Sequence, residues 1–207
     1  LGRVRSTNVR LGDAANTGAI RLGAAWTPVS TFATGVLTLA SSAGITQDAG
    51  GINLGTSTSD LIIRAGAAVT LTDAGNDFTN VAATLGAGAA VTLTDGNAMT
   101  VTTLTDDLGG VAGVTGPGGA TLTATGALLT VADGVNTTNT AVNLNGTGVD
   151  LSGSASDVDA GSGDITVDAG TGNFNMAAGS SLTTTSGDIT ISANSASLSG
   201  LRIRSTS

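Results

Sequence analysis

Residues 65–73 read Ala-Gly-Ala-Ala-Val-Thr-Leu-Thr-Asp, and residues 87–95 repeat the same nine letters 22 positions later. Within the phrase, Val69 and Leu71 alternate with threonines, which is the period-2 pattern of a strand with one buried face. A strand that returns in the same phase after 22 residues predicts a chain wound into stacked coils. The two copies are therefore expected to lie one above the other, with their valines and leucines facing the interior.

A second echo supports the same coil length. Residues 162–166, Ser-Gly-Asp-Ile-Thr, return at 186–190, displaced by 24 positions. Coils of 22–24 residues hold about three short strands and three turns, and the chain would make roughly nine of them. This period exceeds the roughly 18 residues of a left-handed hexapeptide coil and predicts a right-handed parallel β-helix, an all-β solenoid. A β-sandwich also strings short strands between turns, but recurrence of whole phrases at one coil length is not expected of it.

The composition fits a narrow core. Aromatic residues make up 2% of the chain, while the apolar 40% is almost entirely Ala, Val, Leu and Ile. All 15 acidic residues are Asp and all 7 basic residues are Arg. Lys and Glu favour helices and are absent here, whereas Asp, which is present, favours caps and turns. This choice of charged residues indicates a chain with almost no helix.

The same composition excludes several functions. Without His or Cys, the commonest general base, the commonest metal ligands and any disulfide framework are missing. A net charge of −8 argues against nucleic-acid binding, which needs a basic surface. No window approaches the roughly 18 consecutive apolar residues of a membrane-spanning helix. We therefore expect neither catalysis, nor a resident cofactor, nor a transmembrane helix.

We expect one β-solenoid segment over residues 1–207, with irregular loops at 23–34 and 111–120 around the two prolines. Residues 3–7, Arg-Val-Arg-Ser-Thr, are echoed by Arg-Ile-Arg-Ser-Thr at 202–206, a displacement of 199. These phrases contain four of the seven arginines. The hypothesis is that the chain is one unit of about 199 residues, plus overlap, from a tandem array, with copies of itself as end-to-end partners.

Charge is unevenly distributed along the chain. Four of the seven arginines lie in residues 1–22, whereas 23–200 contain Arg64 alone among fourteen aspartates. An array would then alternate basic bands with acidic stretches. One explanation of this pattern is solubility. The other is that neighbouring rods align side by side, with a basic band beside an acidic stretch, and salt would weaken this attraction.

The best metal candidate is an acidic stretch near the C-terminal end, because closely spaced carboxylates and glycine turns suit Ca²⁺. Its spacing matches neither an EF-hand loop nor a calcium-binding β-roll, so an acidic turn in solvent is the alternative. Its residues are Asp157, Asp159, Asp164 and Asp168. Elsewhere, Asp73 and Asp95 end the repeated phrase and are expected to stack as exposed turn carboxylates at one corner of the coil.

Several Thr-x-Thr runs point outward in this interpretation. A flat ladder of such threonines is similar to the ice-binding faces of some antifreeze proteins, and a regular polar face could equally bind glycans. Thr is also an ordinary β-favouring surface residue, so the pattern has a purely structural explanation. The runs are Thr70/Thr72, Thr92/Thr94, Thr100/Thr102 and Thr121/Thr123/Thr125.

The stretches Asp-Ala-Gly-Asn-Asp-Phe at 73–78, Val-Thr-Leu-Thr-Asp-Gly-Asn-Ala-Met-Thr-Val at 91–101 and Ser-Gly-Asp-Ile-Thr-Ile-Ser-Ala at 186–193 resemble repeats of filamentous-haemagglutinin-like surface proteins of Gram-negative bacteria. The resemblance covers about residues 60–207. It implies a β-helix, export across the outer membrane, an extracellular or cell-surface location, and the role of an extended adhesin or fibre with a cell-surface or glycan ligand. Polysaccharide lyases share the β-helix, but their sites combine Asp-bound Ca²⁺ with an Arg or Lys base, and the acidic body here offers only Arg64.

Overall fold

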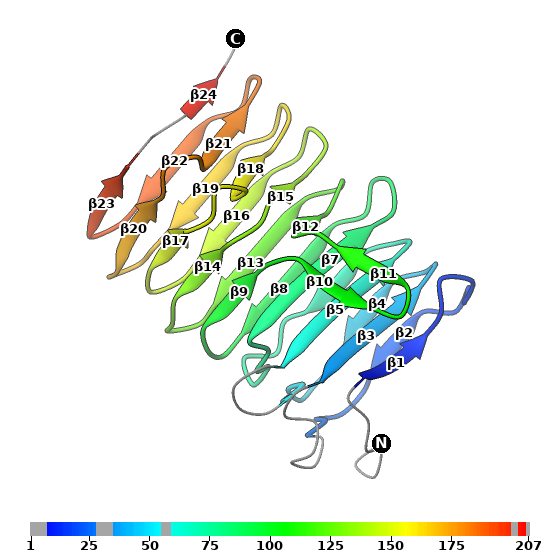
Figure 1. The fold of residues 1–207 in the computed structure, drawn as a ribbon. Coiled ribbons are helices and arrows are strands. Elements are labelled where there is room, and N and C mark those ends of the chain that lie inside the picture. The colour runs from blue at the N-terminus through cyan, green and yellow to red at the C-terminus, as the bar shows by residue number, and fades with distance from the viewer. Residues whose placement is uncertain (1–7, 28–34, 55–58, 200–202, 206–207) are drawn as a thin grey trace.

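The computed structural model describes residues 8–27, 35–54, 59–199 and 203–205. All regular structure in these residues is β-strand. Strands of successive coils pair in parallel, so the chain forms a β-solenoid (Figure 1). This confirms the predicted fold, while its handedness stays a prediction from the coil length. No described segment is a helix of the length and apolarity needed to cross a bilayer.

The eight-stranded sheet takes one strand from each coil, so the described chain makes eight coils where roughly nine were expected. The estimate assumed 22 residues per coil, but Val91 pairs with Ala120, 29 positions later, because one coil carries an insertion. The strands are, in order, β2 (Ile20–Leu22), β4 (Ile45–Gln47), β6 (Val69–Leu71), β8 (Val91–Asp95), β13 (Ala120–Ala124), β16 (Val142–Asn145), β19 (Ile165–Asp168) and β22 (Ile189–Ser192).

The repeated phrases stack as predicted. Leu71 of the first nonapeptide pairs with Leu93 of the second. The later echo stacks in the same way, with Ile165 beside Ile189. Both leucines are fully buried, whereas Thr70, which precedes Leu71 on β6, is exposed. The predicted inward and outward assignment is therefore confirmed for this strand.

The fourteen-stranded sheet forks at β7 (Asn80–Leu85), because the start of β7 pairs with one strand of the next coil and its end pairs with another. Before the fork each coil contributes one strand, namely β1 (Asn8–Gly12), β3 (Val36–Ser41) and β5 (Asp60–Ala65). After it, each coil contributes two short strands. One column contains β9 (Met99–Val101), β14 (Leu129–Val131), β17 (Val149–Leu151), β20 (Asn173–Met176) and β23 (Ser195–Leu198). The other contains β12 (Val114–Thr115), β15 (Val135–Asn136), β18 (Asp157–Asp159), β21 (Ser181–Thr184) and β24 (Ile203–Ser205).

A hairpin interrupts the coil at the fork. Strands β10 (Leu104–Asp106) and β11 (Gly109–Val111) form the one antiparallel pair among the described strands. The hairpin lies against the outer face of the fourteen-stranded sheet, across β3, β5 and β7 (Figure 1).

The structure differs from the expected irregular loop over 111–120. Strand β12 lies within that stretch, and its Val114 is fully buried between Ala83 and Val135. The excursion is formed by residues 102–113 instead, because the apolar residues of the hairpin pack on the outside of the sheet. In the other expected loop, Trp26 forms an isolated bridge with Ile52, and residues 28–34 lie outside the described part of the chain.

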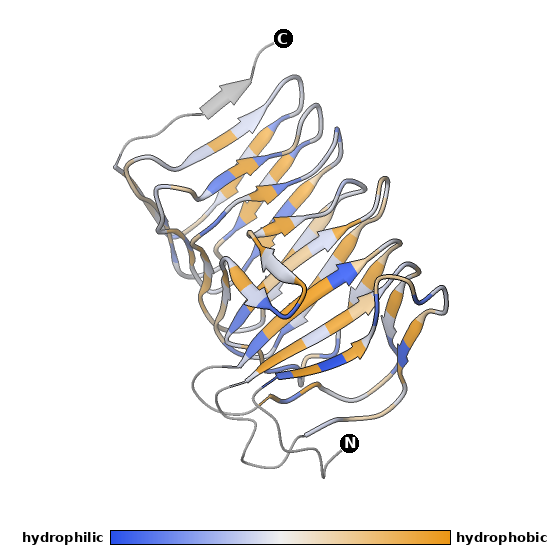
Figure 2. Cartoon of the chain, turned by 45° about the vertical axis from the view of Figure 1, so that its right-hand side comes forward, coloured by the Kyte–Doolittle hydropathy of each residue, from blue (hydrophilic) through white to orange (hydrophobic). Residues whose placement is uncertain are grey.

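One continuous aliphatic core runs the length of the coil stack. Hydrophobic and hydrophilic positions alternate along most strands, so each coil turns one set of side chains inward (Figure 2). Phe78 and Phe174 are the largest fully buried side chains. Small branched side chains fill the rest of the interior, as the composition predicted.

Candidate functional site

The four predicted calcium ligands do not come together. Asp157 and Asp159 lie on β18 of the fourteen-stranded sheet, whereas Asp168 ends β19 of the eight-stranded sheet and Asp164 lies in the turn just before β19. Among the described residues, no group of three or more carboxylates is placed to hold a metal ion.

Each of these carboxylates instead accepts a hydrogen bond from its own turn or from the next coil. Asp159 and Asp168 cap turns by accepting from the amides of Gly161, at 2.8 Å, and Gly170, at 2.9 Å. Asp164 accepts from the Asp188 amide of the next coil at 2.9 Å. Such contacts are typical of Asp in turns.

The most regular candidate for binding is the outer face of the eight-stranded sheet. Parallel register places one outward polar residue of each coil above that of the preceding coil, about 4.8 Å apart. This column is uncharged through seven coils. It consists of Thr46, Thr70, Thr92, Thr121, Asn143, Thr166 and Thr190.

A second outward column lies beside it, two residues further along each strand. Its members are Thr94, Thr123, Asn145, Asp168 and Ser192. Threonine pairs therefore stack directly only where β8 meets β13, and Asn or Asp replaces Thr in later coils. The run Thr100/Thr102 lies away from this face, because Thr100 belongs to the other sheet, and the last run contributes only Thr121 and Thr123, because Thr125 lies in a turn.

Side chains within the two columns interact from coil to coil. The Asn143 amide donates to Thr121 Oγ1 at 3.4 Å, and the Asn145 amide donates to Thr123 Oγ1 at 3.3 Å. The second column borders a shallow groove of about 200 Å³ whose wall includes Thr123, Asn145 and Asp168. Glycines of the adjoining turns line the same groove. The face can therefore offer hydroxyl, amide and carboxylate groups at a regular spacing.

A buried polar corner adjoins one end of the same sheet. Asp95 is fully buried, which corrects the expectation of an exposed turn carboxylate; Asp73, one coil below, is half-buried. Asp95 accepts hydrogen bonds from the amides of Phe78 and Asn97, both at 2.7 Å. Burial raises the pKa of Asp95 to about 7, with a smaller contribution from the charge of Asp77.

This corner extends over several coils. The Gln47 and Asn76 side-chain amides bond each other, and Asn76 also donates to the Thr94 carbonyl at 2.9 Å. Asp73 accepts from the Gly50 amide at 2.7 Å. The sequence signal was present as Asp followed by Gly and Asn, but the pattern does not indicate which carboxylate lies inside the turn.

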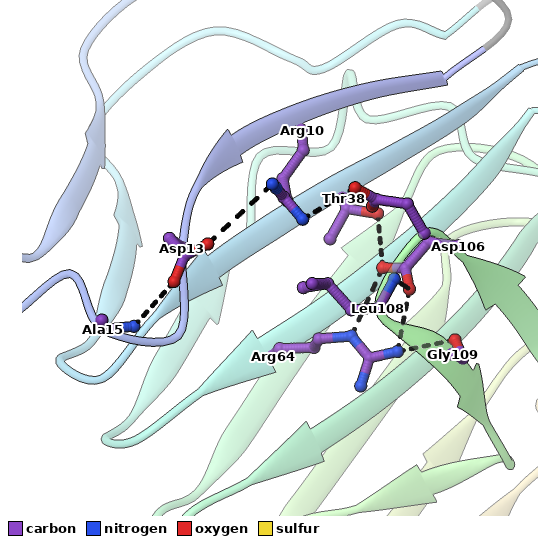
Figure 3. Close-up of polar contacts among 9 residues, drawn as sticks. Arg10, Asp13, Ala15, Thr38, Arg64, Asp106, Leu108 and Gly109 are labelled. Atoms are coloured by element: carbon purple, nitrogen blue, oxygen red, sulfur yellow. Dashed lines mark hydrogen bonds and ion pairs between the residues drawn. The ribbon is translucent and has the colours of Figure 1, made fainter.

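The three arginines whose side chains are described all bind aspartates, which the sequence did not predict. Arg64 contacts Asp106 at 2.9 Å and 3.3 Å, and it also donates to the Gly109 carbonyl at 2.7 Å (Figure 3). Arg10 contacts Asp107 at 2.8 Å, and Arg21 contacts Asp48.

These pairs have consequences for two hypotheses. Arg64, the one candidate for a catalytic base in the acidic body, forms an ion pair with Asp106. The described arginines of the basic band at 1–22 are paired within the chain, which reduces their capacity to attract a neighbouring rod.

Comparisons with protein-family models, with curated proteins and with solved structures gave no match to this chain.

Proposed function

We propose that this chain is a rigid shaft segment of a long extracellular or cell-surface fibre, with a mechanical rather than a catalytic role. The single observation that supports this proposal best is the in-register parallel stacking of eight coils around one aliphatic core. A coil stack is stabilised by contacts between neighbours, so its length can grow without a new kind of core. The resemblance to filamentous-haemagglutinin-like proteins supports the same location and role.

The coil stack is open to continuation at β22, the last strand of the eight-stranded sheet. Its strand β22 is an edge of the eight-stranded sheet, and Ile189 and Ile191 are only partly buried there. In earlier coils the equivalent residues, Ile165 and Val167, are fully covered by the next coil. A further coil in the same register would bury this apolar surface and pair the open backbone ladder.

Electron microscopy of the purified protein tests the shaft proposal. Eight coils at about 4.8 Å per coil give a rod of roughly 40 Å, so longer uniform rods require end-to-end stacking. We expect such rods to shorten in the variant Ile191→Asp, which places a charge on the stacking surface. Thr190→Asp is the matched control because its side chain points outward from the same strand. Only isolated 40 Å particles, at every concentration tested, would contradict the proposal.

A second candidate function is the binding of ice or a glycan by the outer face of the eight-stranded sheet. The observation that favours it is the direct stacking of Thr92 and Thr94 on Thr121 and Thr123. Ice recrystallisation inhibition and glycan-array binding would distinguish the two ligands. Either activity should be lost in the double variant Thr92→Lys/Thr121→Lys and retained in the control Thr130→Lys, because Thr130 lies on the other sheet. If the wild type has neither activity, this candidate is withdrawn.

A further inference from the structure

The β10–β11 hairpin is an insertion that the coil does not need for closure. The chain leaves the coil after Val101 and returns at Val114. One coil later, the equivalent residues Val131 and Val135 are joined by only Ala-Asp-Gly at 132–134. The additional residues therefore serve some purpose other than linking β9 to β12.

The hairpin forms a small second core outside the main one. Leu104 and Val111 pack on Ile62 of β5 and Ala82 of β7, with Val36 of β3 at the margin. Ile62 and Ala82 are fully buried although they are on the outer face of the sheet. The hairpin thus covers an apolar strip that spans three successive coils.

Polar contacts fasten the same hairpin to the same coils. Asp106, whose side chain is 2% exposed, binds Arg64 of β5 and accepts from the Thr38 hydroxyl of β3 at 2.9 Å (Figure 3). Burial alone would raise the pKa of Asp106, but hydrogen bonds from Arg64, Thr38 and the Leu108 amide outweigh it, so the pKa is lowered. Asp107, next along the turn, reaches Arg10 of β1 at 2.8 Å.

These contacts differ in kind from those between neighbouring coils. In a solenoid each coil normally touches only the coils directly above and below, so terminal coils fray one at a time. The hairpin arises from the coil of β9 and β12, which pairs with β7 of the preceding coil. It nevertheless contacts β7, β5, β3 and β1 at once, so it reaches coils with which its own coil is not paired.

We propose that the hairpin is a clasp that fastens the first four coils to the fifth, across the point where the sheet forks. The clasp makes the single-strand section before the fork and the two-column section after it open as one cooperative unit. Without it, the first coils open separately from the rest. This role concerns the coil stack itself and does not depend on the shaft function.

Hydrogen–deuterium exchange on a shortened variant tests the clasp. Replacing residues 102–113 by Ala-Asp-Gly gives this coil the link that its neighbour already uses at 132–134. We expect amides of β1, β3 and β5 to exchange at least about tenfold faster, while those of β16 and β19 keep their wild-type rates. Unchanged exchange in β1, β3 and β5 would overturn the proposal.

Adding Ile62→Thr to the shortened chain controls for the newly exposed apolar strip. If apolar exposure alone caused the faster exchange, this second change would restore the wild-type rates and contradict the clasp. If loss of the fastening causes it, the faster exchange persists.

A single substitution keeps the test valid if the shortened chain fails to fold. Asp106→Asn retains the size of the side chain but leaves Arg64, which is 18% exposed, without its charged partner. We expect exchange in β3 and β5 to accelerate by about tenfold or more, because a nearly buried charge loses its counterion. The matched control is Asp159→Asn, an exposed carboxylate at the end of β18 on another coil. Equal effects of the two substitutions on β3 and β5 would contradict the clasp.

Discussion

At the scale of single residues, alternation between inward and outward positions determines what each side chain contributes. Leu71 and Leu93 fill the interior. Thr70 and Thr92, which precede them in the sequence, belong to the polar outer column. The buried Asp95 is a polar exception inside a turn, where its carboxylate accepts hydrogen bonds from the amides of Phe78 and Asn97.

The two faces of β6 should respond differently to substitution. Leu71→Asp introduces a charge into a fully buried site, and we expect it to lower the free energy of unfolding by about 3–5 kcal/mol. Thr70→Ser alters an exposed position and should change that free energy by less than about 0.5 kcal/mol. Urea unfolding followed by circular dichroism measures both values. Equal destabilisation by the two substitutions would be inconsistent with the assignment of faces.

The buried carboxylate of Asp95 should make stability depend on pH. Its pKa is raised from 3.8 to about 7 in the folded state, so the folded protein binds the proton more tightly than the unfolded chain. The resulting stabilisation is fully present below about pH 4 and is lost as the pH rises to about 7.

Between about pH 4 and pH 7, Asp95 should lower the free energy of unfolding by on the order of 3 kcal/mol. Asp95→Asn removes the titration, and the difference between wild type and variant isolates it from the opposite contribution of Asp106, whose pKa is lowered. The measurement is the free energy of unfolding at several pH values. A wild-type-minus-variant difference that does not vary with pH would show that Asp95 keeps its ordinary pKa.

At the scale of elements, the sequence predicted what repeats and missed what occurs once. The nonapeptide and the later echo indicated both the coil length and the side of each strand that faces inward, because stacked coils impose the same pattern at every turn. The hairpin was missed because Leu104 and Val111 have the apolar character of core residues, yet they pack outside the sheet. The expectation of an exposed Asp95 is wrong because both aspartates end the same nonapeptide, whereas the turns that follow differ, Ala-Gly-Asn after Asp73 and Gly-Asn-Ala after Asp95.

Close approach of the backbones of two neighbouring coils just before β12 gives an element-scale prediction. Gly113 has φ +57°, and an added Cβ would lie 2.0 Å from the Gly134 carbonyl oxygen of the next coil. Gly88 has a similar φ of +71° but has no atom within 4 Å of the equivalent position.

Gly88→Ala should therefore cost about 1 kcal/mol for the backbone conformation alone. Gly113→Ala should cost clearly more, about 2–4 kcal/mol, because the coils must also separate locally. Thermal unfolding of both variants checks the difference. A smaller loss for Gly113→Ala than for Gly88→Ala would contradict the stacking of β12 on β15.

At the scale of the whole molecule, the separation of the four acidic candidates bears on calcium. Asp157 and Asp159 are on one sheet, and Asp168 is on the other. We therefore expect millimolar Ca²⁺ to leave the Tm unchanged within about 1 °C, since only a ligand that binds the folded state raises it. Calorimetric titration provides the second measurement. A saturable heat that disappears in Asp157→Asn/Asp159→Asn would establish a calcium site there.

The parallel pairing of the coils also gives the rod a direction. With the hairpin as the one described exception, every strand pair runs the same way, so the first and last coils expose different sides of the backbone ladder. A molecule that continues this ladder must add head to tail, and along a straight stack this heterologous contact gives an open filament rather than a ring. Such a filament would be polar, like a cytoskeletal filament, because its two tips would be chemically distinct.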